Sequence, residues 1–339
     1  MTLFTDDLDE AELSDVPSAW AEPARPPRSQ REPKPPKPPK PPKPPRRPPR
    51  PPVQREPLTA GQALVRGILA LVAVMLLAFS IDLLVFSHLQ HLAAQQRLTD
   101  AYREQLADGT APVSEGDFDD VLLPDGAPVA ILDIPSIGVH EVVSEGTSSG
   151  VLTGGPGHLR STVLPGQAGV SIVMARAAAY GGPFSRIQEL APGETFTVRT
   201  GQGETEFEVI GLRYAGDATP PAPQRGESRL ILQTARGAPY VPIGVAYVDA
   251  RATDDAKPAG ARQTSTLSLR PQDAALATDT STVWALVFAL QFLVVAEVAA
   301  VWAFRRLGAQ KTWIVFLPVL FLGGLFVADQ LVRLLPNLL

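Results

Sequence analysis

Cysteine is absent from the 339 residues of this sequence, and histidine occurs only four times. Without cysteine the chain has no disulfide, no thiol nucleophile and no thiolate ligand for a metal ion. The histidines form neither an HExxH-type pattern nor another His/carboxylate spacing that binds metal. We therefore expect no metal site and no cofactor. The histidines are His88, His91, His140 and His158.

Proline, by contrast, is abundant, and about half of the 35 prolines lie before residue 60. Residues 1–24 are acidic and have few side chains that could form a core, whereas residues 34–52 read KPPKPPKPPKPPRRPPRPP. The net charge of −5 therefore averages segments of opposite sign. We expect residues 1–60 to be a disordered tail, acidic at first and then rich in Pro, Lys and Arg.

Repeated prolines favour an extended polyproline II helix over residues 34–52, with lysines along one edge. That edge suits anionic lipid headgroups, and PxxP motifs suit the aromatic grooves of a cytoplasmic partner protein. A soluble spacer without a partner is the third alternative. No aromatic residue interleaves with the charges, so we expect no binding to nucleic acid.

Three long apolar runs are each long enough to cross a hydrocarbon core of about 30 Å as a helix. They cover residues 64–86, 283–304 and 313–335. The basic tail precedes the first run, and Arg305, Arg306 and Lys311 lie between the other two, so the positive-inside rule places both basic segments in the cytoplasm. We expect a multi-pass protein of the plasma membrane whose N-terminus is cytoplasmic and whose central region and C-terminus are extracytoplasmic. The long segment before the first run, with no cleavage site after it, indicates an uncleaved anchor.

The region between the first two apolar runs has three parts. Residues 87–110 are rich in helix formers and predict a helical stalk. Residues 126–252 contain seven or eight short β-rich runs separated by Gly and Pro turns, which predicts a closed β-barrel or a sandwich. Residues 253–282 are polar and predict a flexible linker to the second span. Within the spans, Glu297 is expected either to pair with another group or to reach the inner interface, and Gly323–Gly324 permits close helix packing.

Five segments of the central region carry recognisable motifs: IPSIGV (134–139), EGTSSGVLTGGPGH (145–158), PGQAGVSIVMARAAAYGGPFSRI (165–187), LAPGETFTV (190–198) and RLILQTARGAPYVPIGVAYVDA (229–250). Together they resemble sortases, the membrane-anchored transpeptidases of Gram-positive bacteria, and most of all the actinobacterial class E group. The resemblance implies a mainly β fold, the sortase eight-stranded barrel, placed outside the membrane over residues 126–252.

The same resemblance puts the family's catalytic roles on residues that cannot perform them. The cysteine position matches Ala235, whose methyl group has no lone pair to attack a carbonyl. The histidine position matches Arg176, whose guanidinium stays protonated and can act neither as base nor as acid. The position of the oxyanion-stabilising arginine matches Gly244. We therefore expect a pseudoenzyme with no catalytic residue.

The candidate ligand groove consists of His158, Arg176, Tyr180 and Thr234. For His158 the alternative is a structural turn residue, because the family commonly has a histidine there beside the catalytic one. Arg176 either fills the vacated space, pairs with a carboxylate, or binds a peptide carboxylate or another anion. Strand alternation points Thr234 to the face opposite Ala235.

The leading hypothesis is an inactive sortase-like membrane protein that acts as an extracytoplasmic scaffold at the cell envelope. Its ligand is a sorting-signal-like peptide or another envelope protein. A second hypothesis is a transmembrane signalling or assembly subunit that recruits a partner through the proline-rich tail. The third is a transpeptidase that works without cysteine.

Overall fold

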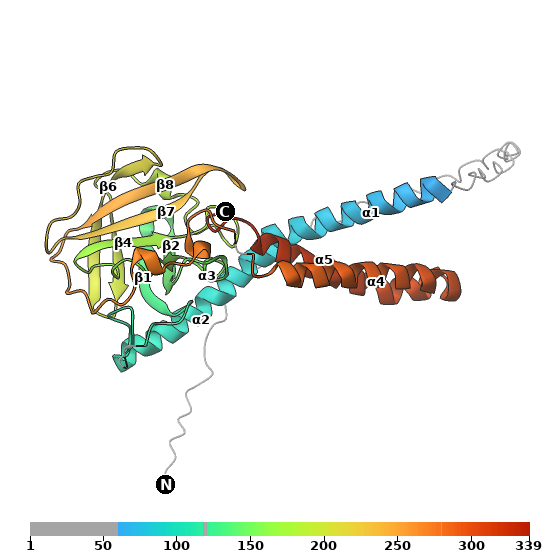
Figure 1. Cartoon of the computed structure of the whole chain (residues 1–339), viewed down its shortest axis with the longest axis horizontal. Helices are drawn as coiled ribbons and strands as arrows, with labels where there is room; N and C mark the ends of the chain where they lie inside the picture. The colour runs from blue at the N-terminus through green and yellow to red at the C-terminus, as the bar shows by residue number, and fades with distance from the viewer. Residues whose placement is uncertain (1–59, 118, 120, 279) are drawn as a thin grey trace, which may run out of the picture. The chain divides into compact units, whose positions relative to one another are not determined.

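The computed structural model describes residues 60–117, 119, 121–278 and 280–339. The proposed disordered tail, with its lipid or partner contacts at residues 34–52, lies outside the described residues. The described chain begins with α1 (Ala60–Ile81), continues through a π-helical turn at Asp82–Phe86 and runs on as α2 (Ser87–Asp108) without a break (Figure 1). Gly109 ends α2 in the left-handed conformation, as its lack of a Cβ atom allows.

Eight strands close into a barrel, which confirms the predicted fold (Figure 1). The strands are β1 (Pro128–Ile134), β2 (Val139–Glu145), β3 (Gly157–His158), β4 (Gly169–Met174), β5 (Thr195–Thr200), β6 (Gly203–Tyr214), β7 (Ser228–Ala238) and β8 (Val241–Ala252). Their order around the barrel is β1-β2-β3-β4-β7-β8-β6-β5. The β2–β3 and β4–β7 pairs are parallel and the others are antiparallel.

Strand alternation gives the barrel wall near the end of β4 two different faces. Val173 and Ala175 belong to the main apolar core inside the barrel, together with Leu232 of β7 and Val248 of β8. Met174, one residue from both Val173 and Ala175, belongs to a second buried cluster on the outer face of the wall. The candidate site is built on this outer face.

Helix α2 is attached to the barrel through side chains that satisfy strand backbone groups. Gln95 Nε2 donates to the carbonyls of Val142 (3.1 Å) and Gly154 (2.7 Å), and Gln95 Oε1 accepts from the Val142 amide at 2.8 Å. Further along the helix, the Tyr102 hydroxyl donates to Val129 O at 2.9 Å. Because α2 continues α1, these bonds fix the barrel to the first apolar helix.

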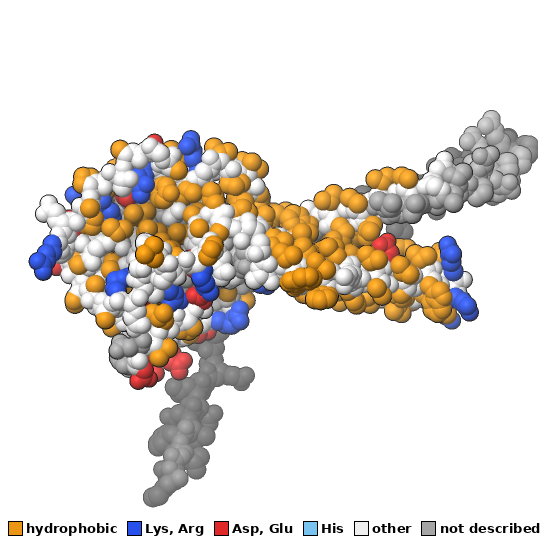
Figure 2. All heavy atoms as spheres, in the orientation of Figure 1, with side chains coloured by type: hydrophobic (Ala, Val, Ile, Leu, Met, Phe, Trp, Pro, Cys, Tyr) orange, Lys and Arg blue, Asp and Glu red, His pale blue; other side chains and the backbone are white. Residues whose placement is uncertain are grey.

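Helices α4 (Val283–Leu307) and α5 (Ala309–Arg333) form a hairpin, and α5 also packs against α1. At Gly323 an added Cβ atom would lie 3.2 Å from Leu293 Cδ1 of α4, which is a tight contact, whereas one at Gly324 would lie 3.7 Å from the Cβ of Ala78 in α1, an ordinary van der Waals distance. Three helices of the described chain are long and apolar enough to cross a membrane. Apolar side chains cover much of their visible surface, and a group of Lys and Arg side chains marks the tip of the hairpin (Figure 2).

The segment between β8 and α4 is bonded to the barrel at several points, although its composition predicts a flexible linker. Lys257 Nζ donates to Glu204 O at 2.7 Å and to Thr205 Oγ1 at 2.8 Å. Arg270 forms an ion pair with Asp125, which also binds Arg160 at 2.9 Å. The segment thereby reaches the outer face of the barrel beside the second apolar cluster.

Candidate functional site

The second apolar cluster contains Ala235, the residue that the resemblance predicts at the cysteine position of sortases. We call it the Ala235 cluster, and its buried members are Leu152, Met174, Ala235, Val245, Leu338 and Leu339. Four of them come from the barrel region: Leu152 from the short helix α3 (Ser149–Leu152), and the others from β4, β7 and β8. The remaining two belong to the segment that follows α5. The chain therefore places its own residues 338–339 in the same buried cluster as Ala235, which is itself only 4% exposed.

Arg176 lies at the edge of this cluster and is fully buried. Its Nη1 donates to the backbone oxygen of Leu339 at 2.9 Å, and its Nη2 donates to Ser149 Oγ at 2.8 Å and Ser149 O at 3.3 Å. The guanidinium carbon also lies 5.1 Å from the centroid of the Tyr180 ring, a cation–π contact. Within the described residues, no Asp or Glu side chain forms an ion pair with Arg176.

Burial without an acidic side chain as partner destabilises the charged form of Arg176. Desolvation lowers its pKa to about 10, and the positive charge of Arg333 acts in the same direction, while Tyr180 opposes the shift. A pKa of about 10 still leaves the guanidinium protonated at neutral pH. Arg176 can therefore donate hydrogen bonds and hold positive charge, but it cannot accept a proton.

The segment after α5 lies along this site in a defined way. Ala177 N donates to Leu338 O at 2.8 Å, next to the bond between Arg176 and Leu339. Asn337 Nδ2 donates to Gln272 O at 2.6 Å and Ala274 O at 2.9 Å, both in the segment between β8 and α4. Residues 337–339 are consequently held on one side by the end of β4 and on the other by residues 272–277.

The four residues of the sequence-derived groove do not share one face. Thr234 donates from Oγ1 to Ala175 O at 3.0 Å, on the face opposite Ala235 as alternation predicts. The His158 ring is buried, with Nδ1 hydrogen-bonded to Glu145 Oε2 at 2.9 Å and Nε2 hydrogen-bonded to Val163 O at 2.8 Å. Both ring nitrogens are thus bound within the protein, which is the arrangement of a structural histidine. Only Arg176 and Tyr180 are in contact with each other. A ligand role for His158 and Thr234 stays a prediction.

Tyr180 connects the site to the apolar helices. It has a positive φ of 51° and packs in a buried cluster with Val332 of α5 and Phe79 of α1. Burial raises its pKa to about 12, with the nearby Asp329 carboxylate acting in the same direction. Tyr180 is therefore a neutral aromatic surface between the guanidinium of Arg176 and the helix pair.

Gly244 has an empty surrounding but a restrictive backbone. A Cβ atom on Gly244 would meet nothing within 4 Å, yet the φ of +157° at this residue is rarely adopted by residues with a side chain.

Arg213 lies on the face of the barrel wall that carries the Ala235 cluster. This residue of β6 pairs in register with Tyr247, a partly buried neighbour of that cluster. Arg213 stacks 4.2 Å from the Tyr247 ring centroid and binds Asp249 at 2.6 Å. Sequence reasoning missed Arg213, because only the β6–β8 register brings it to this face.

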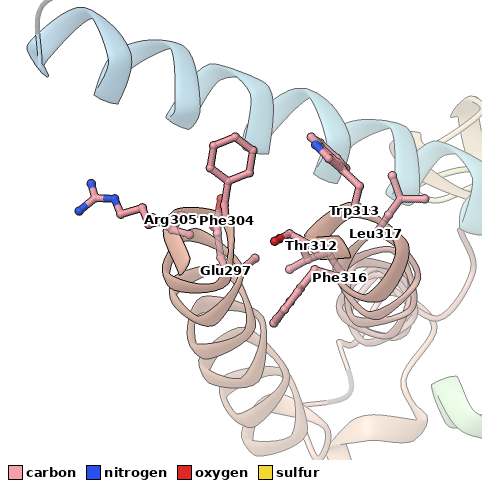
Figure 3. A pocket seen from close by; sticks show the side chains of 10 residues that line it. Glu297, Phe304, Arg305, Thr312, Trp313, Phe316 and Leu317 are labelled. Atoms are coloured by element: carbon pink, nitrogen blue, oxygen red, sulfur yellow. The ribbon is translucent and has the colours of Figure 1, made fainter. Parts of the chain in front are cut away.

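A separate apolar pocket of about 240 Å³ lies between α4 and α5 near the turn that joins them (Figure 3). Glu297 and Arg305 of α4 and Thr312, Trp313 and Phe316 of α5 are among its lining residues. No Lys, Arg or His side chain of the described chain forms an ion pair with Glu297. The described residues also contain no group of three or more His, Asp or Glu that could hold a metal ion.

Comparison with known proteins agrees with this geometry. Residues 132–241 match the family model of the sortase domain. No curated protein sequence matches the chain significantly. The barrel, with its closed eight-stranded order, and the family match over residues 132–241 lie on the same part of the chain.

Solved structures similar to the chain include three sortases. The Clostridium perfringens sortase D5 transpeptidase is 18% identical, with 49% of this chain and 99% of that one covered and a TM-score of 0.37. Sortase E1 from Streptomyces coelicolor, with a tripeptide in its active site, is 20% identical, with coverage of 39% and 91% and a TM-score of 0.34. Sortase A from Corynebacterium diphtheriae is 16% identical, with coverage of 56% and 96% and a TM-score of 0.36. The family model thus assigns residues 132–241, most of the β-barrel, to the sortase domain.

Proposed function

We propose that this protein is a membrane-anchored sortase-like pseudoenzyme whose barrel holds peptide or protein segments at the outer face of the cell membrane. The observation that carries the proposal is that residues 338–339 of the chain itself lie in the Ala235 cluster, beside Arg176. Ala235 and Arg176, at the family's cysteine and histidine positions, are buried against the chain's own residues 338–339. A site that binds a peptide segment without a nucleophile beside it supports retention of a ligand over its cleavage.

Neighbouring side chains do not supply the missing chemistry. Arg176 remains protonated at neutral pH, so it cannot activate a hydroxyl or a water as a general base. The Thr234 hydroxyl donates to Ala175 O on the opposite face. The Ser149 hydroxyl accepts from Arg176 and donates to Arg333 O at 3.0 Å, so both of its hydrogen-bonding roles are in use. These assignments argue against a transpeptidase that works without cysteine.

Two connections support an extracytoplasmic barrel. Helix α2, which continues α1, binds the barrel at Gln95, and the segment after α5 binds it at Arg176. The barrel ends of α1 and α5 therefore belong on the same side of the membrane. Arg305 and Arg306 lie at the other end of the α4–α5 hairpin, where the positive-inside rule places the cytoplasm.

Turnover of a fluorogenic sorting-type peptide by the full-length protein in detergent or proteoliposomes tests the proposal. We expect no cleavage and no transfer to an amine acceptor by the wild-type protein. Turnover that disappears on a point substitution in the barrel would overturn the assignment as a pseudoenzyme.

The binding role is tested by cross-linking and pull-down from the native membrane with the wild type and Arg176→Ala side by side. We expect a specific envelope partner or peptide that the wild type retains and the variant loses. Arg251→Ala is a useful control, because this arginine is exposed and forms a surface ion pair with Glu208. Absence of any partner or peptide ligand with the wild type would contradict the scaffold role.

A further inference from the structure

Residues 335–339 have the contacts of a bound peptide. Leu338 is fully buried, Leu339 is 3% exposed, and both lie in the Ala235 cluster. Burying two leucine side chains contributes favourably because apolar surface is removed from water. The segment also has a polar anchor, Asn337, which is fully buried and bound through its side-chain amide.

Backbone contacts add direction to this apolar recognition. Ala177 N and Arg176 Nη1 donate to the consecutive carbonyls of Leu338 and Leu339. On the other side, Asn337 N donates to Ala277 O at 3.0 Å. The site thus binds an amide side chain followed by two leucine side chains, together with the backbone groups that connect them.

We propose that residues 335–339 are a tethered ligand of this site, which covers Ala235 until a peptide of the same chemistry takes their place. The proposal rests on the peptide-holding function argued above and names its ligand class: an uncharged, leucine-rich peptide with an amide side chain beside two apolar residues. Arg176 holds the ligand through a backbone oxygen, that of Leu339, and the site does not require an acidic side chain.

The tether determines how readily such an exchange occurs. Leu335 N donates to Val332 O, so the ligand segment starts directly after the last turn of α5. A ligand on so short a connection competes at an effective concentration on the order of mM. A peptide in solution therefore binds the intact protein much more weakly than it binds a protein whose own segment has been displaced.

The absence of cysteine provides a clean reporter, because one introduced thiol is the only one in the chain. Ala235→Cys places it under residues 338–339, and Leu267→Cys, at a position that is 96% exposed, calibrates the reagent. We expect a water-soluble maleimide to modify residue 235 at least about tenfold more slowly than residue 267. The double substitution Leu338→Asp/Leu339→Asp should then accelerate modification of residue 235 by a similar factor, while Leu267→Asp leaves it unchanged.

Two further variants guard against a change in folding. Ala250→Cys reports on the barrel core and should stay unreactive in the double-aspartate background. Asn337→Ala removes only the hydrogen bonds to Gln272 and Ala274 and should accelerate modification of residue 235 to a smaller extent. If the double-aspartate variant exposes residue 250, its barrel is disturbed, and the rate of modification of residue 235 in the Asn337→Ala variant then tests the proposal. Equal rates at residues 235 and 267 in the otherwise intact chain, or no acceleration in either variant, would overturn the proposal.

Exchange is measured by fluorescence anisotropy with a labelled, C-terminally amidated peptide of the sequence Leu-Leu-Pro-Asn-Leu-Leu, which is that of residues 334–339. We expect binding to the double-aspartate variant at least about tenfold tighter than to the wild type, and loss of that binding when Arg176→Ala is added. Equal affinities, or no binding to the double-aspartate variant, would contradict the tethered-ligand proposal. Turnover of a peptide would instead overturn the pseudoenzyme assignment and leave the thiol-protection result intact, so the two failures are distinguishable.

Discussion

Arg176 Nη1 lies 2.9 Å from the backbone oxygen of Leu339, a residue 163 positions later in the chain. This bond connects the residue that is predicted at the sortase histidine position to the segment that follows the last apolar helix. The same arginine stacks on Tyr180, which packs against Val332 of α5. A position that would carry proton transfer in the family is thus part of the joint between the barrel and the helices.

The stability of this joint depends on both the volume and the hydrogen bonds of Arg176. We expect Arg176→Ala to lower the free energy of unfolding by about 2–4 kcal/mol, because it leaves a cavity and removes the donors to Ser149 and Leu339. Arg176→Met should cost less, since it fills most of the volume and removes a buried charge that no acidic side chain neutralises. Thermal unfolding of the three proteins in the same detergent provides the comparison. An equal loss in both variants would show that volume contributes nothing.

The fold could be predicted from the sequence because its signals are local. Short β-rich runs between Gly and Pro turns predict a closed barrel or a sandwich, the resemblance to sortases favours the barrel, and eight strands form one. The three apolar runs likewise correspond to three helices that are long enough to cross a membrane. In both cases the pattern of a single segment carries the information, with no need for contacts between distant residues.

The site could be predicted only in part, because its contacts join distant segments. The motif around Tyr180 and the strand of Ala235 placed two positions of the site correctly relative to their own elements. Nothing in the sequence near Leu339 shows that it binds Arg176, since that contact depends on where α5 ends relative to the barrel. Arg213 was missed for the same reason, because its position beside Tyr247 follows from strand register.

The loop after Arg176 owes its close approach to α2 to a glycine. Gly181 has a φ of +79°, and a Cβ atom there would lie 2.8 Å from Cδ2 of the buried His91 side chain. We expect Gly181→Ala to destabilise the protein by about 2–3 kcal/mol, the sum of backbone strain and the contact with His91. Gly138→Ala is the matched control, because Gly138 has a similar φ of +72° with nothing within 4 Å of the added atom. Equal shifts in melting temperature for the two variants would exclude a steric contribution from His91.

Asp125 makes the attachment of the segment between β8 and α4 sensitive to acid. Partial burial raises the pKa of this carboxyl, but hydrogen bonds from Arg270 and Arg160 outweigh that effect and hold the pKa below its usual 3.8. The folded-state pKa is depressed, so the stabilisation is complete above the unfolded pKa of about 4 and is lost as the pH falls through the lower folded value. Because these groups are partly exposed, we expect only about 1 kcal/mol from the pairs.

Hydrogen exchange in residues 266–277 measures this attachment. Asp125→Asn should increase exchange at pH 6, where the wild-type carboxylate is charged, and the difference between the two proteins should be smaller at pH 3. Comparing them at each pH cancels the intrinsic dependence of exchange on acidity. Arg251→Ala controls for loss of a surface ion pair, because Arg251 binds Glu208 of β6, away from this segment. A constant difference between wild type and Asp125→Asn at both pH values would contradict the assignment.

Gln95 is the side chain on which the attachment of α2 to the barrel most depends. It is buried and makes three hydrogen bonds to backbone groups of Val142 and Gly154. Replacing it with Ala leaves those groups without partners in a site that water does not reach, so we expect a loss of about 2–3 kcal/mol. Gln95→Glu should be at least as harmful, because it places a carboxylate against two carbonyl oxygens. Gln96→Ala is the control, because Gln96 is the next residue on the same helix and its side chain is exposed. Limited proteolysis within α2 is the measurement, and cleavage should accelerate in both Gln95 variants and stay unchanged in Gln96→Ala. Protection of α2 in all three variants would show that the apolar contacts of Tyr102 suffice to hold the helix on the barrel.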